Sequence, residues 1–261
     1  MGLPIQFLSD LHCDFGGNWC NMLNCPVMAE TLVIAGDVLP WTYPKWNRFC
    51  DNILSRWPRV IHVMGNHDYW GMDVNNSDHR QKLSFMKIRD EWKTKKNSSG
   101  STEYYQIHND FVDIHGIRIL CSTLWSPVVR EVFSIIRGMN DYQQIKGFTV
   151  DLNNTLNSQS VSYLELMLQD TKHKCVVVTH NLPLWCFVQL KFWNSTLNEA
   201  YANDLRNLVE RFSDKIKLWN FGHTHDFIRK EIMGIDFLCN PVGYYEVGQD
   251  TGFDNKLVVE V

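Results

Sequence analysis

The chain has 261 residues, of which 44% are apolar and 21% charged, a balance typical of a folded globular protein and not of a disordered one. Its net charge of −4 and isoelectric point near 6.2 give no electrostatic reason to expect a nucleic-acid or anionic-membrane surface. No apolar run reaches the roughly 18 residues of a membrane-spanning helix, and the N-terminus MGLPIQFLSD lacks the basic segment of a signal peptide.

Five apolar, β-rich runs each end abruptly in polar residues that can bind metals. They span residues 4–12, 31–37, 60–68, 175–181 and 216–225. Near-continuous apolar character is typical of strands that are buried on both faces. Helix-like stretches separate most of these runs, at about 44–56, 159–170 and 199–212. This alternation of strand and helix predicts a layered α/β fold.

Two regions interrupt the alternation, and we expect them to be insertions in a single domain that spans residues 1–261. Residues 72–103 hold a charged, helix-like piece, DHRQKLSFMKIRDEWKTKK, followed by the polar loop NSSGST. Residues 127–158 have an irregular or helical pattern.

Further strands are expected outside the five runs. The segment EYYQIHNDFVDIHGIRILCSTLW predicts consecutive strands with turns near Asn109-Asp110 and His115-Gly116. Segments 227–239, with a turn at Gly234, and 256–261 again resemble strands.

The eight cysteines are scattered, and several lie in apolar runs such as RILCST and KCVVVTH. This pattern favours buried free thiols in a reducing compartment over disulfides, so we expect a cytoplasmic protein that does not bind a membrane.

The polar residues at the ends of the five runs form the candidate site. Ligands of open α/β sheets gather at the carboxyl ends of strands, so side chains that follow different strands can meet there. A single histidine of this kind is more often structural, but together they suggest a site. The candidates are Asp10, His12, Asp37, Asn66, His67, Asp68, His180, His223 and His225.

These side chains offer oxygen and nitrogen donors and no thiolate, a set that suits Mn, Fe, Zn, Co or Ni ions. The supply of donors is too large for one ion. Two metal ions that share one carboxylate would use it fully.

The ordered series D-x-H, GD, GNHD, H and GHTH, between residues 10 and 225, resembles the calcineurin-like metallophosphoesterase superfamily. Each element alone is weak, but five in order are specific. The segments CSTLWS and MNDY further resemble a branch of small predicted phosphoesterases. The resemblance implies a four-layer α/β (α+β) fold, in which two mixed β-sheets form a sandwich flanked by helices.

The resemblance also implies a role for each candidate residue. One metal ion would be held by Asp10, His12 and His225. The other would be held by Asn66, His180 and His223, and Asp37 would bridge the two. His67 would not bind metal but would act on the substrate, as a hydrogen-bond or proton donor. Asp68 could orient His67 or keep it charged.

The implied activity is dinuclear, metal-dependent hydrolysis of a phosphomonoester or phosphodiester, of a small molecule or nucleotide, by a metal-bridging hydroxide. A nuclease of the same superfamily is the first alternative, although the chain has no basic stripe. A protein phosphatase is less favoured, because GDVLPW replaces the expected GD-x-x-DRG. A metal-free scaffold would lack a ligand, and none is missing. Protein partners remain open.

Several further residues could shape the pocket, in the loops 69–103 and 126–158. Aromatic side chains that could stack a base are Tyr69, Trp70, Trp125, Tyr142 and Tyr244, although aromatics more often belong to a core. Arg130 and Arg137 could clamp a second phosphate, although a solvated position is the commoner one for an arginine.

Overall fold

The structure is a computed structural model that describes residues 2–93, 101–172 and 174–261. One sheet contains β1 (Pro4–Leu8), β2 (Thr31–Ala35), β3 (Arg59–Val63), β4 (Met86–Lys93), β5 (Ser101–His108) and β12 (Val258–Glu260). The other contains β6 (Asp110–Ile114), β7 (Ile117–Ser122), β8 (Cys175–Thr179), β9 (Ile216–Phe221), β10 (Ile228–Ile232) and β11 (Ile235–Cys239). The helices are α1 (Gly16–Asn24), α2 (Trp46–Asn52), α3 (Ser77–Ser84), α4 (Val132–Gly138), α5 (Asp141–Gln144), α6 (Val150–Asp170) and α7 (Arg206–Arg211).

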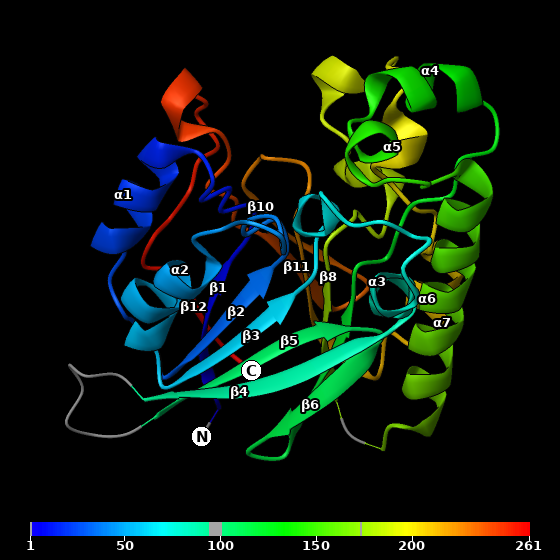
Figure 1. The fold of residues 1–261 in the computed structure, drawn as a ribbon. Coiled ribbons are helices and arrows are strands. Elements are labelled where there is room, and N and C mark those ends of the chain that lie inside the picture. Colours follow the sequence, from blue (N-terminus) through cyan, green and yellow to red (C-terminus); the bar gives the residue numbers. More distant parts are fainter. Residues whose placement is uncertain (1, 94–100, 173) are drawn as a thin grey trace.

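The two sheets are built in the same way (Figure 1). Their strand orders are β12-β1-β2-β3-β5-β4 and β10-β11-β9-β8-β7-β6. In each sheet the four inner strands run parallel, and the strand at either edge is antiparallel to its neighbour. Both sheets are therefore mixed, which confirms the expected fold class.

The layers follow from the period of two along each buried strand. On β2, Val33 and Ala35 point into a core that they share with Val176 and Val178 of β8 in the opposite sheet. The intervening residues of β2 point to the other side and pack with α1 and α2. This core between the sheets supports our proposal that residues 1–261 form one domain.

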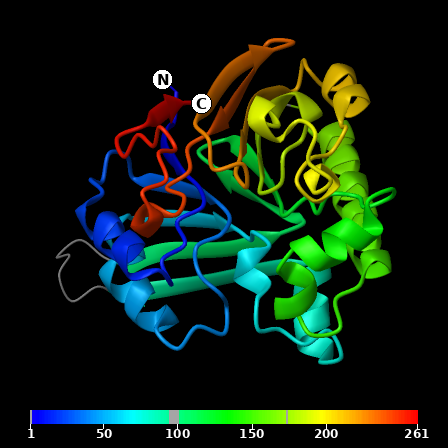
Figure 2. The ribbon, with the colours of Figure 1, turned by 90° about the horizontal axis from the view of Figure 1, so that it is seen from above.

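Helices cover the outer faces of the sandwich. Leu164 and Leu168 of α6 and Val209 of α7 pack against Val177 and Trp219 on the outer face of the second sheet. With α1 and α2 on the first sheet, the order of layers is helix, sheet, sheet, helix (Figures 1 and 2).

The structure corrects several predicted elements. The charged piece 78–96 is helical only to Ser84; from Met86 it forms β4, because pairing with all eight residues of β5 outweighs its local helical tendency. The helix expected at 159–170 begins at Val150, where the Thr149 side chain accepts a hydrogen bond from the amide of Leu152.

The remaining predictions were mixed. The helix expected at 199–212 is confined to α7, and α1 was not predicted. The turns near residues 109, 115 and 234 are confirmed. Residues 97–100 of the expected polar loop lie outside the described residues.

Cys13, Cys25, Cys121, Cys175 and Cys239 are buried free thiols, and Cys186 is an exposed one. Within residues 2–93, 101–172 and 174–261, no helix combines the length and the apolar character that crossing a bilayer requires.

The core between the sheets gives a stability prediction. Leu238 of β11 is fully buried there, so Leu238→Ala should lower the free energy of unfolding by about 2–5 kcal/mol through lost burial and a residual cavity. Leu190→Ala, at a side chain that is 88% exposed, should change it by less than about 0.5 kcal/mol. Urea unfolding curves compare the two, and equal midpoints would contradict the assigned core.

Candidate active site

All the candidate residues lie just beyond the carboxyl ends of parallel inner strands, at one end of the sandwich (Figure 1; seen from that end in Figure 2). Loops after β1, β2 and β3 supply part of the set from the first sheet. Loops after β8 and β9 supply the rest from the second. The described structure therefore brings together the side chains that the sequence pattern singled out.

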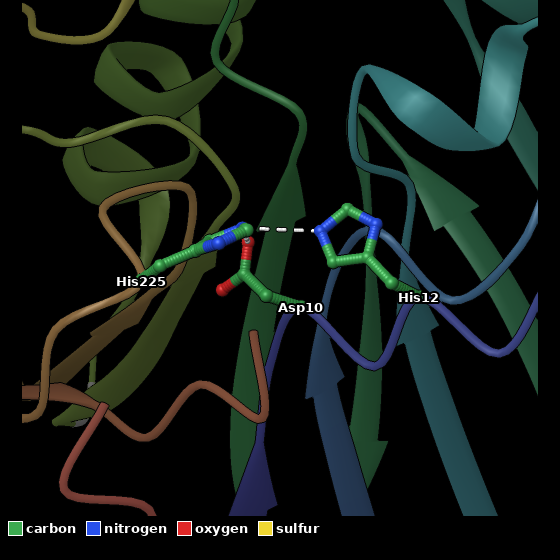
Figure 3. Close-up of side chains that lie close together, drawn as sticks. All are labelled: Asp10, His12 and His225. Carbon is green, nitrogen blue, oxygen red and sulfur yellow. Dashed lines mark hydrogen bonds and ion pairs between the residues drawn. The ribbon is translucent and has the colours of Figure 1, made fainter. Parts of the chain in front are cut away.

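The first cluster contains Asp10, His12 and His225 (Figure 3). The Nε2 atoms of His12 and His225 are 3.0 Å apart, and Asp10 Oδ1 lies 3.4 Å from His225 Nε2. His225 Nδ1 donates to Gln249 Oε1, and that oxygen also accepts from the amide of Tyr244. Gln249 therefore fixes the His225 ring with Nε2 directed at the cluster.

The second cluster contains Asp37, His180 and His223, with Asn66 beside them. His180 Nε2 lies 3.1 Å from His223 Nδ1 and 2.9 Å from Asn66 Oδ1. His180 Nδ1 donates to the carbonyl of Ala35, which directs Nε2 into the cluster. The amide nitrogen of Asn66 donates to Asp141, so its oxygen is the atom that faces the histidines.

One oxygen of Asp37 reaches both clusters. Its Oδ2 atom lies 3.7 Å from His12 Nε2 and 3.4 Å from His180 Nε2. The Oδ1 atom is occupied by the backbone amide of His67, which donates to it over 2.8 Å. This hydrogen bond fixes the carboxylate with Oδ2 between the two groups of imidazoles.

The pKa values of the two imidazoles in each pair shift in opposite directions. Burial and the neighbouring imidazole lower the pKa values of His12 and His223 well below the usual range. Burial also opposes charge on His180 and His225, but the carboxylates of Asp37 and Asp10 raise both pKa values, that of His180 to about 9.

The donors of the two clusters suit divalent metal ions. Converging lone pairs from imidazole, carboxylate and amide oxygen are the donors that borderline divalent ions accept. An imidazole nitrogen binds a metal ion only when it is deprotonated, so metal binding should release any proton that a ligand carries. The first cluster and the second cluster with Asn66 could hold ions, and His12, Asp14 and His67 form a third group whose ligand atoms lie close enough to do so.

The loops that carry these donors are locally strained. Left-handed backbone φ angles occur at Asp10 (51°), His12 (42°), Asp37 (55°), His223 (69°) and His225 (48°). This conformation costs a residue with a side chain roughly 1–2 kcal/mol. Such residues persist only where the surrounding structure fixes them, and they concentrate at functional sites.

Two glycines allow the loops to approach closely. Gly36 has a φ angle of +85°, and a Cβ atom there would overlap the ring of His180. A Cβ atom at Gly65 would overlap the Asp37 carboxylate. Both positions therefore require glycine.

Asp68 connects the loops after β2 and β3. Its fully buried carboxylate accepts hydrogen bonds from the amides of residues 37, 38, 39 and 65, and it lies 3.0 Å from His62 Nε2. The orienting contact of His67 comes from a different residue. This carboxylate therefore fixes the backbone of the site and makes no contact that would orient the His67 ring, but its charge does help to raise the pKa of His67, as the second expectation held.

The partner of His67 is Asp14, which was not among the predicted site residues. Asp14 Oδ2 lies 3.0 Å from His67 Nε2, and the His67 ring stacks on Trp70 with centroids 3.8 Å apart. Burial opposes charge on His67, but the hydrogen bond to Asp14 and the Asp37 carboxylate raise its pKa above the usual value. The alternating pattern Asp10-x-His12-x-Asp14 was a signal that could have identified Asp14.

A cavity of about 360 Å³ opens over His67, His223 and His225. Trp70 and Tyr244 line it, as predicted. The other aromatic candidates do not line it, because Tyr69, Trp125 and Tyr142 pack in a core cluster. Much of the wall comes from residues 182–201, which the sequence did not predict. Residues 138–141 come from the expected loop 126–158. Among the described residues of the expected loop 69–103, Trp70 alone lines the cavity.

The two arginines proposed as a phosphate clamp also lie elsewhere. Arg130 is exposed and pairs with Glu199 over 2.8 Å, and the Arg137 guanidinium lies 4.2 Å from the centre of the Phe133 ring. Neither lines the cavity, so the clamp prediction is wrong.

Comparison with known proteins places this site in a family. A family model described as calcineurin-like phosphoesterase matches residues 3–227. The chain belongs to the calcineurin-like phosphoesterase family. Among curated proteins, this phosphoesterase is 24% identical over 270 residues to the uncharacterized protein L509 of Acanthamoeba polyphaga mimivirus, covering 92% of this chain and 91% of that one.

Among solved structures, the phosphoesterase is similar to the phosphopantetheinyl hydrolase of Mycobacterium tuberculosis. The TM-score is 0.66 at 16% identity, with 94% of this chain and 91% of that chain covered. This likeness concerns the fold. Family membership supports a phosphoester hydrolase that uses divalent metal ions as the general class of activity.

The position of Asp68 gives a second stability prediction. Asp68→Ala should lower the free energy of unfolding by at least about 3 kcal/mol, because it leaves buried backbone amides without an acceptor. Unfolding is measured in a chelator, so that metal loss cannot explain the change. Asp236→Ala removes a partly exposed ion pair with Arg229 and should cost less than about 1 kcal/mol. If the Asp68→Ala variant were stable but inactive, Asp68 would have a catalytic role instead of a structural one.

Proposed function

We propose that the protein is a dinuclear metal-dependent phosphoesterase that hydrolyses a phosphomonoester or phosphodiester of a small molecule. The observation that carries this proposal is the position of Asp37 Oδ2 within 3.7 Å of one histidine cluster and 3.4 Å of the other. A carboxylate oxygen in this position is suited to bridge two ions.

The proposed ligands are those that the family resemblance implied. One ion is held by Asp10, His12 and His225, and the other by Asn66, His180 and His223, with Asp37 shared. The hydrogen bonds of Gln249, Ala35 and Asp141 support this assignment, because each directs a ligand atom toward its cluster.

Bound ions at these positions supply a nucleophile at neutral pH and neutralise charge that develops on the phosphoryl group. His67 lies at the floor of the cavity, where its ring can contact a phosphoryl or leaving-group oxygen. Asp14 and the stacked Trp70 hold the ring in place. The nuclease alternative gains no support, because no lysine or arginine is among the described residues that line the cavity.

Replacement of the shared carboxylate tests the proposal. Asp37→Asn should weaken binding of both ions, and lower turnover of p-nitrophenyl phosphate and bis(p-nitrophenyl) phosphate, by at least about 100-fold, since even residues behind the ligands contribute about 10–100-fold. Elemental analysis after dialysis and initial rates give the two readouts, with Asp236→Asn as the surface control. Two retained ions with near-normal rates would contradict the bridging role.

Replacement of His67 tests its place in the chemistry. His67→Ala should retain both ions but lose about 10²–10⁴-fold in rate, most severely for alkyl phosphates, whose leaving groups depend most on a proton donor. Loss of metal in this variant would instead make His67 a ligand.

Asp14→Ala should lower kcat with little change in KM or bound metal, because it frees the His67 ring. Combined with His67→Ala, it should cause no further loss, as expected for two residues that act as one unit. Additive losses would show that Asp14 acts independently of His67.

A further inference from the structure

The cavity has an apolar wall beside the metal cluster. Leu182, Val188, Phe192 and Leu197 come from the segment after β8, and Met139 faces them from the loop after α4. Leu197 packs on the C-terminal end of α4, since a Cβ atom at Gly138 would lie 2.7 Å from its side chain, and it belongs to the same apolar cluster as Met139. The wall is therefore a packed surface formed by two segments.

The wall supplies no positive charge. The acidic and imidazole groups among the described lining residues are Asp37, Asp141, His67, His223 and His225, and all of them lie at the metal-facing end. Arg130 is held outside by Glu199. A second anionic group that lies along this wall, away from the proposed ions, would meet no facing cation, so losing its water there would be unfavourable.

The side-chain amides of Gln189 and Asn198 in the wall already donate hydrogen bonds within the protein. The Gln189 side chain donates to the carbonyl of Thr224, and the Asn198 side chain donates to the carbonyls of Phe192 and Trp193. These donors hold the segment in shape and are not available to an anion.

The apolar surface continues from the wall to the outside. Phe192 lines the cavity and is 50% exposed. The neighbouring side chains of Leu190 and Trp193 are 88% and 55% exposed. Adjacent exposed apolar side chains of this size commonly mark a binding surface.

We infer that the substrate is a phosphoester whose organic part is uncharged and largely apolar, with no second phosphate. This inference rests on the proposed function and names its substrate class. For a monoester, water attacks phosphorus, the bond between phosphorus and the organic oxygen breaks, and the products are an alcohol and inorganic phosphate. The departing oxygen takes up a proton, balanced by the proton that the attacking water loses, and leaves as the alcohol, whose apolar chain lies along Val188 and Phe192.

A series of alkyl phosphates tests the inference with the purified full chain and Mn²⁺. From butyl through hexyl to octyl phosphate, kcat/KM should rise by at least about 10-fold, because each buried methylene favours binding. Octane-1,8-diol bisphosphate carries the same chain with a second phosphate and should react at least about 10-fold less efficiently than octyl phosphate.

Two substitutions of Phe192 test whether the apolar wall causes the preference for long, uncharged chains. Phe192→Ser should flatten the dependence on chain length, and Phe192→Lys should narrow the gap between octyl phosphate and the bisphosphate. Phe133→Ser and Phe133→Lys are matched controls, since Phe133 is 68% exposed on α4 and does not line the cavity. Bound metal and circular dichroism check that each variant is folded.

The outcomes separate the two proposals. Hydrolysis of p-nitrophenyl phosphate together with a flat chain-length series, or with equal or better use of the bisphosphate, would overturn the inference alone. No metal-dependent hydrolysis of any of these esters would overturn the proposed function and the inference with it. The wild-type series decides the matter even if a variant fails to fold.

Discussion

The side chains at the centre of this molecule direct lone pairs at one another, and only a positive charge between them removes the repulsion. His12 faces His225 and His180 faces His223, with nitrogens 3.0 and 3.1 Å apart, and a carboxylate lies beside each pair. In water each group would be solvated separately. Here burial leaves protons or metal ions as the species that can satisfy them, so the chemistry of the protein depends on which of the two is bound.

The architecture makes such crowding possible. Four parallel inner strands in each sheet bring loops from distant parts of the chain to one end of the sandwich. Asp68 then joins the loops after β2 and β3 through their backbone amides, and Gly36 and Gly65 allow side chains to approach where a Cβ atom would collide. The energy of a large, well-packed core thus offsets an unfavourable local arrangement.

The sequence predicted those parts of the site that follow from a repeated pattern along the chain. Apolar runs, each followed by a ligand-type residue, predicted strands buried on both faces and the convergence of the nine candidates. The predictions failed where contacts between distant parts of the chain determine the secondary structure. The charged segment that became β4 has a helical local pattern, and only its partner strand β5 makes it extended.

Local sequence patterns could not predict the environment of His67 either. Asp68 is its neighbour in sequence, yet it is Asp14, 53 residues earlier, whose carboxylate meets the imidazole. The wall formed by residues 182–201 consists mainly of short turns without a regular period, so its apolar residues carried no recognisable signal.

The left-handed backbone at five of the proposed ligands has a consequence beyond catalysis. A loop held in an unfavourable conformation is the first part of a protein to open, and a cation that binds only the closed form opposes that opening. The supply of metal in the cell should therefore govern how long the protein survives proteases as well as how fast it works. Starvation for metal would then remove the enzyme along with its activity.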